Sequence, residues 1–169
     1  MDVRTVALRL GLAFLLGSLL GLERELRGQS AGLRTHLLVS LGSCLFTLSS
    51  IYAALPLAGG GFQGAEADIT RIASQVVVGI GFLGGGAILR HGTSVRGLTT
   101  AANLWLTASI GMAAGLGFSA GAAITAGLAL VVLVALRPVE RFIERFRRVN
   151  LIPSDQDIAA DDKPSEPQR

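Results

Sequence analysis

Five long apolar runs fill the chain from about residue 4 to residue 137 and constrain what it can fold into. A helix that crosses a hydrocarbon core of about 30 Å needs roughly 20 mainly apolar residues, and each run is close to that length. Hydrophobic residues make up 50% of the chain and charged residues only 16%, whereas an average soluble domain carries about 25% charge. We therefore predict an all-α, polytopic membrane protein.

The predicted transmembrane domain, residues 1–137, contains five helices. The spans are expected at about residues 4–22, 36–57, 72–89, 98–116 and 119–137. Because only residues 115–121 separate the last two spans, one long kinked helix is an alternative to a hairpin, although such a helix would overrun a single bilayer. No cleavage pattern follows the first span, so we expect it to be retained.

Arginine is concentrated after the first, third and fifth spans, and short basic loops remain in the cytoplasm. The residues concerned are Arg24, Arg27, Arg34, Arg90, Arg96, Arg137, Arg141, Arg145, Arg147 and Arg148. The loop after the second span carries Glu66 and Asp68 instead. This distribution predicts an N-terminus outside the cell and a C-terminus in the cytoplasm.

The segment after the fifth span is predicted to form a separate basic helix over residues 138–150, followed by an acidic, disordered tail over residues 151–169. Pro138 suits the first turn of this helix. Its apolar stripe consists of Val139, Phe142, Ile143, Phe146 and Val149. The helix is expected to lie on the inner leaflet, with anionic lipid as its partner and a protein as the alternative.

Glycine and a short internal repeat indicate how the helices pack. Pairs of glycines four residues apart let helix backbones approach closely. The predicted spans contain three such pairs, Gly17/Gly21, Gly81/Gly85 and Gly111/Gly115. The tetrapeptide at residues 32–35 also recurs in part at residues 97–100, which predicts that the first two helices and the next two form a parallel repeat.

Polar residues in or beside the spans are the candidate site, because a charge in mid-membrane costs about 2.5–3.5 kcal/mol. An inner cluster contains Glu23, Arg24, Glu25, Arg34, Thr35, His36, Arg96, Thr99, Thr100 and Asn103. An outer cluster contains Arg9, Asp68, Arg71 and Gln75. A rise of 1.5 Å per residue places Gln75 and Asn103 about 15 Å apart in depth, so no continuous polar path is predicted.

The chemistry of the inner cluster suits an anionic headgroup or the carboxylate of a partner protein. Arg9 can either reach the outer headgroups or pair with Asp68. Magnesium prefers oxygen ligands, but Glu23, Glu25 and Asp68 are divided between the two faces, so the sequence shows no complete metal site. Cys44 is the only cysteine and is expected to be a buried filler.

The chain shows no hydrolase, nucleotide-binding or zinc motif. Neither an enzyme nor a cofactor is therefore predicted. The net charge of +3 mostly reflects the arginines after the spans and does not indicate nucleic acid binding.

Five ordered sequence blocks resemble the membrane domain of the MgtC/SapB family. They are Gly21–Glu25, Ala31–His36, Arg71–Val77, Gly79–Gly84, and Val95–Ala102 followed by Leu104-Trp105. The resemblance implies a bacterial inner-membrane protein with about five helices, associated with magnesium homeostasis, stress or virulence. Several members are linked to growth in low magnesium and to survival inside macrophages, and one branch is reported to restrain the F-type ATP synthase.

Longer family members carry a cytoplasmic C-terminal domain of the ACT type, where this chain has its basic helix and acidic tail. Ligand sensing by that domain is therefore not transferred. The resemblance implies a regulatory protein that binds a membrane-protein partner or a second copy of itself. The alternative is a small transporter or channel for magnesium or another cation, in which an oligomer lines a route with Glu23, Asp68, Gln75 and Asn103.

Overall fold

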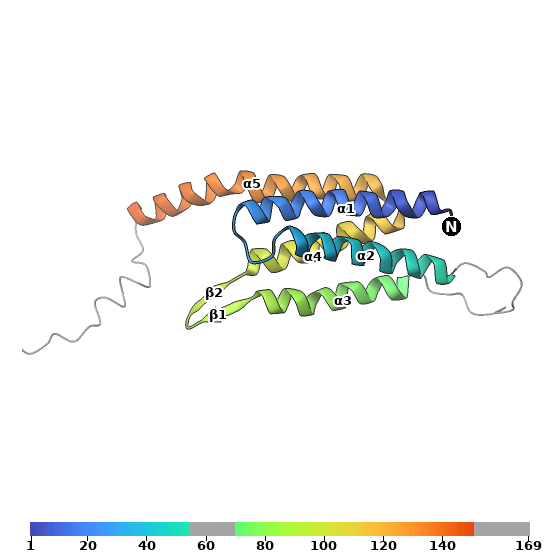
Figure 1. Ribbon diagram of the computed structural model, residues 1–169. Helices are drawn as coiled ribbons and strands as arrows, with labels where there is room; N and C mark the ends of the chain where they lie inside the picture. Colours follow the sequence, from blue (N-terminus) through green and yellow to red (C-terminus); the bar gives the residue numbers. More distant parts are fainter. Residues whose placement is uncertain (55–69, 151–169) are drawn as a thin grey trace, which may run out of the picture. The chain divides into compact units, whose positions relative to one another are not determined.

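Five helices and one short β-hairpin make up the part of the chain that the structure describes, residues 1–54 and 70–150 (Figure 1). In this computed structural model the elements are α1 (Val3–Leu26), α2 (Leu33–Ala54), α3 (Thr70–Ala87), β1 (Leu89–His91), β2 (Ser94–Arg96), α4 (Leu98–Leu116) and α5 (Ser119–Asn150). The chain divides into two units, residues 1–130 and 131–169. Helices α1 to α4 and the hairpin therefore belong to the first unit.

Among the described residues, three helices are long and apolar enough to cross a membrane, over Val3–Leu26, Leu33–Ala53 and Ser119–Leu136. The stretch Ser74–Ala87 of α3 is also apolar but shorter. Helix α4 has 19 residues, and Asn103 with three threonines lowers its hydropathy. These helices confirm the prediction of a multi-pass membrane protein, and the first four lie close to their predicted spans.

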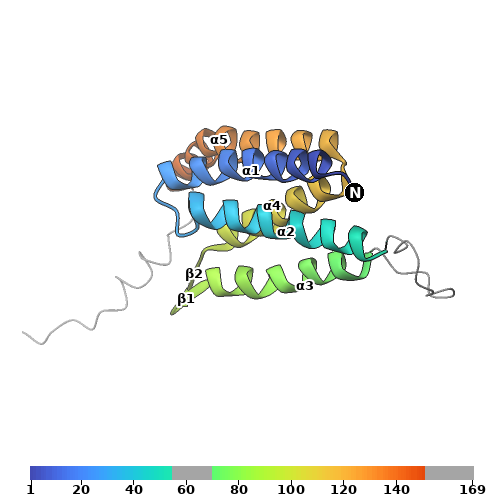
Figure 2. The same ribbon diagram turned by 45° about the vertical axis from the view of Figure 1, so that its right-hand side comes forward.

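Helix α2 is the centre of the first unit. It packs against α1, α3 and α4, and α4 in turn contacts α1 and α3. Figures 1 and 2 show α1 and α3 on opposite sides of the α2/α4 pair. One buried apolar cluster joins α1, α2 and α4 through Ala13, Cys44, Leu48 and Ala114. Cys44 is fully buried in this cluster, as expected for a small filler.

Glycines in α1 and α4 let the backbones of these helices approach the backbone of α2 closely. A Cβ atom at Gly17 would come 2.8 Å from the Cβ of Ser40, and one at Gly21 would come 2.8 Å from the Cα of Leu33. A Cβ atom at Gly111 of α4 would overlap the carbonyl oxygen of Ser40. A side chain at any of these positions would therefore push the helices apart.

The three glycine pairs do not all serve this purpose. Gly115 joins Gly111 in contacting α2, since a Cβ atom there would come 2.8 Å from the carbonyl oxygen of Cys44. The packing prediction is therefore confirmed for the pairs in α1 and α4. For Gly81 and Gly85 in α3 it is wrong within this chain, because an added Cβ atom at either position would meet nothing within 4 Å.

The repeated glycine-leucine sequence opens α2 and α4 in the same way. Gly32 precedes α2 and Gly97 precedes α4, and each carbonyl accepts the first backbone hydrogen bond of its helix, at 3.2 and 2.9 Å. A Cβ atom at Gly32 would overlap the carboxylate of Glu25, and one at Gly97 would overlap the carbonyl oxygen of Ala87. This local match supports the predicted repeat, whereas the relation between the whole helix pairs stays a prediction.

The five helices confirm the predicted all-α class, and one short β-hairpin is an addition that was not predicted. The pairs are Leu89 with Arg96, Arg90 with Val95, and His91 with Ser94. The two-residue connection begins at Gly92, whose φ of 60° is accessible to glycine at little cost. Strands of three residues are too short for a pattern of alternating polarity to be recognised in the sequence.

Helix α5 is a single helix of 32 residues with Pro138 in its interior. We predicted a span that ends at residue 137 and a second helix that begins at Pro138, and the structure joins the two segments. At 1.5 Å per residue, α5 is about 48 Å long, which exceeds a hydrocarbon core of about 30 Å. Its apolar span ends at Leu136, and Phe142 and Phe146 are exposed on the part that follows. The predicted acidic tail lies outside the described residues.

The glycine contacts predict opposite effects of the same substitution on two helices. Gly111→Ala is expected to destabilise the protein by about 1–3 kcal/mol, because the new methyl group meets the backbone of α2. The matched control Gly81→Ala has open space and should stay within about 1 kcal/mol of the parent or stabilise it. Unfolding in detergent micelles measures both, and equal losses would contradict the contact.

Candidate functional site

The inner cluster lies where the end of α1 meets the starts of α2 and α4, and the structure divides it into two halves (Figure 1). The buried half consists of Glu23, Arg24, His36, Thr100 and Asn103. The other half contains the exposed residues Glu25, Arg34, Arg96 and Thr99 and the partly exposed Thr35. The prediction of a single polar surface therefore describes two sets of residues with different environments.

Arg24 is the centre of the buried half, with only 2% of its surface exposed. Its Nη2 donates to Gln29 Oε1 at 2.7 Å and to Thr100 Oγ1 of α4 at 3.4 Å. Nη1 lies 3.9 Å from a carboxylate oxygen of Glu23. The side chain thus ties the end of α1 to the following loop and to the first turn of α4.

Glu23 balances this buried positive charge. Its carboxylate forms a close ion pair with Arg27, one turn further along α1, in addition to the contact with Arg24. A buried ion pair is no reliable source of net stability, but loss of one partner leaves a costly uncompensated charge. The group is therefore expected to keep a fixed geometry.

His36 and Asn103 form the second buried connection, between α2 and α4. Their Nε2 and Nδ2 atoms are 2.8 Å apart, and His36 Nδ1 lies 2.9 Å from the carbonyl oxygen of Gly32. One assignment satisfies both bonds: Nδ1 carries the hydrogen and donates to Gly32, and Nε2 accepts from the amide of Asn103. A neutral histidine held on both sides is a structural link between the helices.

A polar seam continues from this link along α2. It consists of His36, Ser40, Ser43, Thr47 and Ser50, all of them buried and spaced three or four residues apart. Ser40 Oγ donates to the carbonyl of Ala13 in α1 at 2.8 Å, and Thr47 Oγ1 donates to the carbonyl of Ser43 at 2.8 Å. These hydroxyl groups satisfy backbone carbonyls where the glycines bring the helices together.

Sequence reasoning missed most of this seam. Ser40, Ser43, Thr47, Ser50 and, on α4, Thr107 were not singled out. Their helical spacing was a usable signal, because a stripe of small hydroxyl residues marks a helix-packing face in a membrane protein. Gln29 gave no comparable signal, since its role depends on how the loop brings it to Arg24.

Glu25 belongs to the exposed half but has a defined local role. Its Oε2 accepts a hydrogen bond of 2.9 Å from the backbone nitrogen of Leu33, the first residue of α2. A carboxylate at this position satisfies a free N–H group and suits the positive end of the helix dipole. Glu25 is therefore better explained as the cap of α2 than as a metal ligand.

The outer cluster is described only in part. Arg9 Nη1 donates to the carbonyl oxygen of Gly115 in the last turn of α4 at 2.7 Å, so Arg9 caps that helix. Asp68 lies outside the described residues, and of Arg71 only the backbone is described, within the first turn of α3. The predicted pairing of Arg9 with Asp68 therefore stays a prediction.

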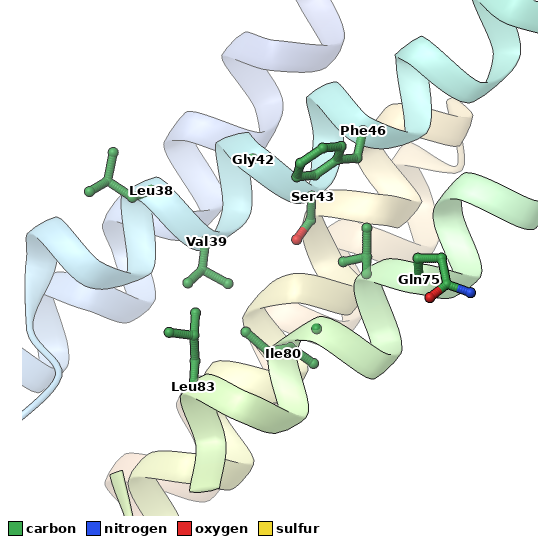
Figure 3. Close-up of a pocket in the computed structure, with 10 residues that line it drawn as sticks. Leu38, Val39, Gly42, Ser43, Phe46, Gln75, Ile80 and Leu83 are labelled. Atoms are coloured by element: carbon green, nitrogen blue, oxygen red, sulfur yellow. The ribbon is translucent and has the colours of Figure 1, made fainter. Parts of the chain in front are cut away.

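Gln75, the fourth member of the outer cluster, lines a groove between α2 and α3 (Figure 3). The groove has a volume of about 470 Å³ and is mainly apolar, with Ser43 as its other polar residue. Gly42 and Gly79 widen it, because neither would bring a Cβ atom within 4 Å of a neighbour. Asn103 is not among the residues that line this groove, and the predicted difference in depth between Gln75 and Asn103 stays a prediction.

The described part of the chain contains no group of three or more histidine, cysteine, aspartate or glutamate side chains that could hold a metal ion. The acidic residues Glu23 and Glu25 are engaged with Arg27 and with the backbone of Leu33. The arrangement can therefore hold the helix ends in fixed positions and expose basic side chains. Both features suit the binding of a partner molecule.

The link between His36 and Asn103 predicts a specific loss of stability. Asn103→Ala should destabilise the protein by about 1–2 kcal/mol, because it removes the interhelical hydrogen bond and leaves a buried acceptor on His36. Thr99→Ala on the exposed face of the same helix turn is the control and should be nearly neutral. Unfolding in detergent measures the difference, and similar effects of both changes would argue against the link.

Comparison with known proteins places these features in a family. The sequence profile of the MgtC family matches residues 10–142. An uncharacterised protein of Synechocystis is 44% identical over 136 residues, which cover 80% of this chain and 54% of that protein. The MgtC proteins of Salmonella typhimurium and Brucella abortus are 48% and 44% identical over 86 residues, which cover 51% of this chain and 32% of each relative.

The chain spans about half of the Synechocystis protein and about a third of the MgtC proteins it matches. No solved structure gives a significant match. The matched residues 10–142 include nearly all of the described helices and the whole inner cluster. By its sequence, therefore, this chain belongs to the MgtC family.

Proposed function

We propose that the chain is a regulatory, non-enzymatic protein of the bacterial inner membrane that acts by binding a membrane-protein partner. The observation that carries this proposal is the division of the inner cluster. Its buried half is bonded internally and holds three helix ends, while Arg34, Thr35 and Thr99 remain accessible around it. A rigid base with exposed basic and hydroxyl groups suits recognition of a partner carboxylate.

The polar seam favours this role over conduction. The hydroxyl groups of Ser40 and Thr47 bond to backbone carbonyls, and the glycines at 17, 111 and 115 bring the helix backbones into contact around them. A route for hydrated ions needs polar groups that face open space. Around Ser40 and Thr47 the seam is a packed contact instead.

The physiological part of the proposal rests on the family. We infer an association with magnesium homeostasis, stress or virulence from the resemblance to MgtC proteins, of which this chain matches about a third. Anionic lipid is the proposed partner of the basic part of α5, whose exposed residues include Phe142, Arg145 and Phe146. Such a stripe beside basic groups suits the headgroup region.

The alternative function, a cation transporter formed by an oligomer, is favoured by one observation. Gln75 is exposed in the groove between α2 and α3, and Ser43 lines the same groove (Figure 3). A second copy that closed this groove would enclose both polar groups. Five membrane crossings, with the N-terminus outside, are common to both functions.

Crosslinking from the exposed half of the cluster tests the regulatory proposal. A photoreactive group at Thr99 should capture one stoichiometric membrane protein in cells, and Arg34→Ala should reduce its yield severalfold. Arg4→Ala, an equal charge change at the other end of the bundle, is the control and should leave the yield unchanged. Recovery of lipid alone, or equal loss in both variants, would argue against a protein partner.

Ion flux separates the two functions. Purified protein in liposomes is expected to give no magnesium uptake above that of protein-free liposomes. Uptake that depends on protein and disappears in Gln75→Leu would replace the regulatory proposal with the transporter. Gly11→Leu, at an open position of α1, controls for a general effect of a larger side chain.

Cysteine accessibility tests the membrane orientation. In a Cys44→Ser background, a cysteine at position 68 should react with an impermeant maleimide from outside intact cells, and one at position 96 only after permeabilisation. This outcome follows from the arginine-rich loops facing the cytoplasm. Reaction of both positions from the same side would exclude the proposed arrangement.

A further inference from the structure

The β-hairpin between α3 and α4 carries a gradient of polarity along its length. Next to the helices lie the exposed apolar residues Ile88, Leu89, Val95 and Leu98. The two strand pairs nearest the helices each combine one apolar residue with one arginine, Leu89 with Arg96 and Val95 with Arg90. The far end consists of the polar turn around Gly92 and Thr93.

The direction of this gradient is defined by the fold. In both views the hairpin extends beyond the ends of α3 and α4, so its apolar end is near the helices and its turn is farthest from them (Figures 1 and 2). Arg90 Nε donates to the carbonyl oxygen of Gly92 at 3.0 Å, which directs its guanidinium toward the turn. The two strand pairs nearest the helices thus combine apolar and basic residues, and the turn beyond them is polar.

The hairpin is held at its base but little covered along its length. Gly97 adopts a φ of 88° and leaves no room for a Cβ atom beside the Ala87 carbonyl, which joins the second strand closely to the end of α3. Among the described elements, the main contact of each strand is the other strand. A two-stranded hairpin alone is only marginally stable in water, so its exposed apolar residues need a cover from outside this unit.

We infer that this hairpin is a lipid anchor, in which Arg90 and Arg96 bind anionic phospholipid headgroups of the leaflet at this end of the bundle. Guanidinium groups match the geometry of phosphate oxygens, and long basic side chains keep their charge at the interface while their stems stay in apolar surroundings. The neighbouring apolar residues would then contact the adjoining acyl chains. Water alone would provide no cover for them.

The occupant is a lipid rather than free phosphate or a protein strand for two reasons. Free phosphate would bind the arginines but leave the exposed Leu89 and Val95 uncovered. A partner strand would form backbone hydrogen bonds along the free edge of the hairpin. Such pairing would not explain why the side chains become more polar from the base of the hairpin to its turn. This inference holds whether or not the proposed regulatory function does, and it assigns Arg96 to lipid.

Lipid-specific fluorescence quenching tests the inference with the full chain. In a Cys44→Ser background, Val95→Cys carries an environment-sensitive fluorophore in phosphatidylcholine nanodiscs that contain a small share of headgroup spin-labelled lipid. The spin label is placed either on phosphatidylglycerol or on phosphatidylcholine. The same fluorophore on Thr93→Cys reports the turn.

Spin-labelled phosphatidylglycerol is expected to quench the fluorophore at position 95 more than spin-labelled phosphatidylcholine does, by up to about fivefold for each arginine. Arg90→Gln with Arg96→Gln should abolish the difference, whereas Arg4→Gln should leave it intact. Position 93, next to the Gly92 carbonyl that Arg90 contacts, should show the same preference for phosphatidylglycerol. Excess inorganic phosphate should not reverse the effect.

Equal quenching by both lipids, little quenching at position 95, or reversal by inorganic phosphate would overturn the inference. Circular dichroism checks that the double variant keeps its helices. Native mass spectrometry of unlabelled protein provides a second measurement, because the parent should retain more phosphatidylglycerol than the double variant. Equal retention would count against the anchor even if the label disturbed the hairpin.

Discussion

The close approach of α2 to α1 and α4 is the contact on which the rest of the structure depends. Between apolar helices in lipid there is little hydrophobic driving force, so association relies on van der Waals contact and hydrogen bonds. Gly17 and Gly111 supply the contact, since a Cβ atom at either position would meet Ser40. Only at this spacing can Arg24 reach Thr100 and Asn103 reach His36.

The molecule therefore combines a tightly bonded centre with more open surroundings. The buried charges of Glu23 and Arg24 are balanced within the end of α1, and the hydroxyl groups of Ser40 and Thr47 bond to backbone carbonyls. Helix α3 differs, because Gly81 and Gly85 face open space and a groove separates part of it from α2. Binding of other membrane components is better accommodated on this open side than within the seam.

Family membership gives this arrangement a wider setting. The profile match includes α1 to α4 and part of α5, so the glycine contacts and the inner cluster belong to the portion shared with MgtC relatives. The 86 residues aligned with the Salmonella and Brucella proteins make up about a third of each of those proteins. A bonded centre of this kind can serve as a scaffold for different attached segments, because Arg24, His36 and Ser40 form their hydrogen bonds within the bundle.

The sequence by itself determined the helical, membrane-embedded character, the positions of four helices and the glycine-leucine starts of α2 and α4, because run length and turn residues are local properties. It also singled out the residues of the inner cluster, whose role as a functional site stays a prediction. Only the tertiary structure decided that Arg24 and His36 are buried while Arg34 and Thr99 are exposed, since burial depends on which helix faces meet. Sequence reasoning also missed the hairpin, because strands of three residues are too short to show a pattern of alternating polarity. It missed the continuity of α5 through Pro138, because a proline fits both the start and the interior of a helix in a membrane protein.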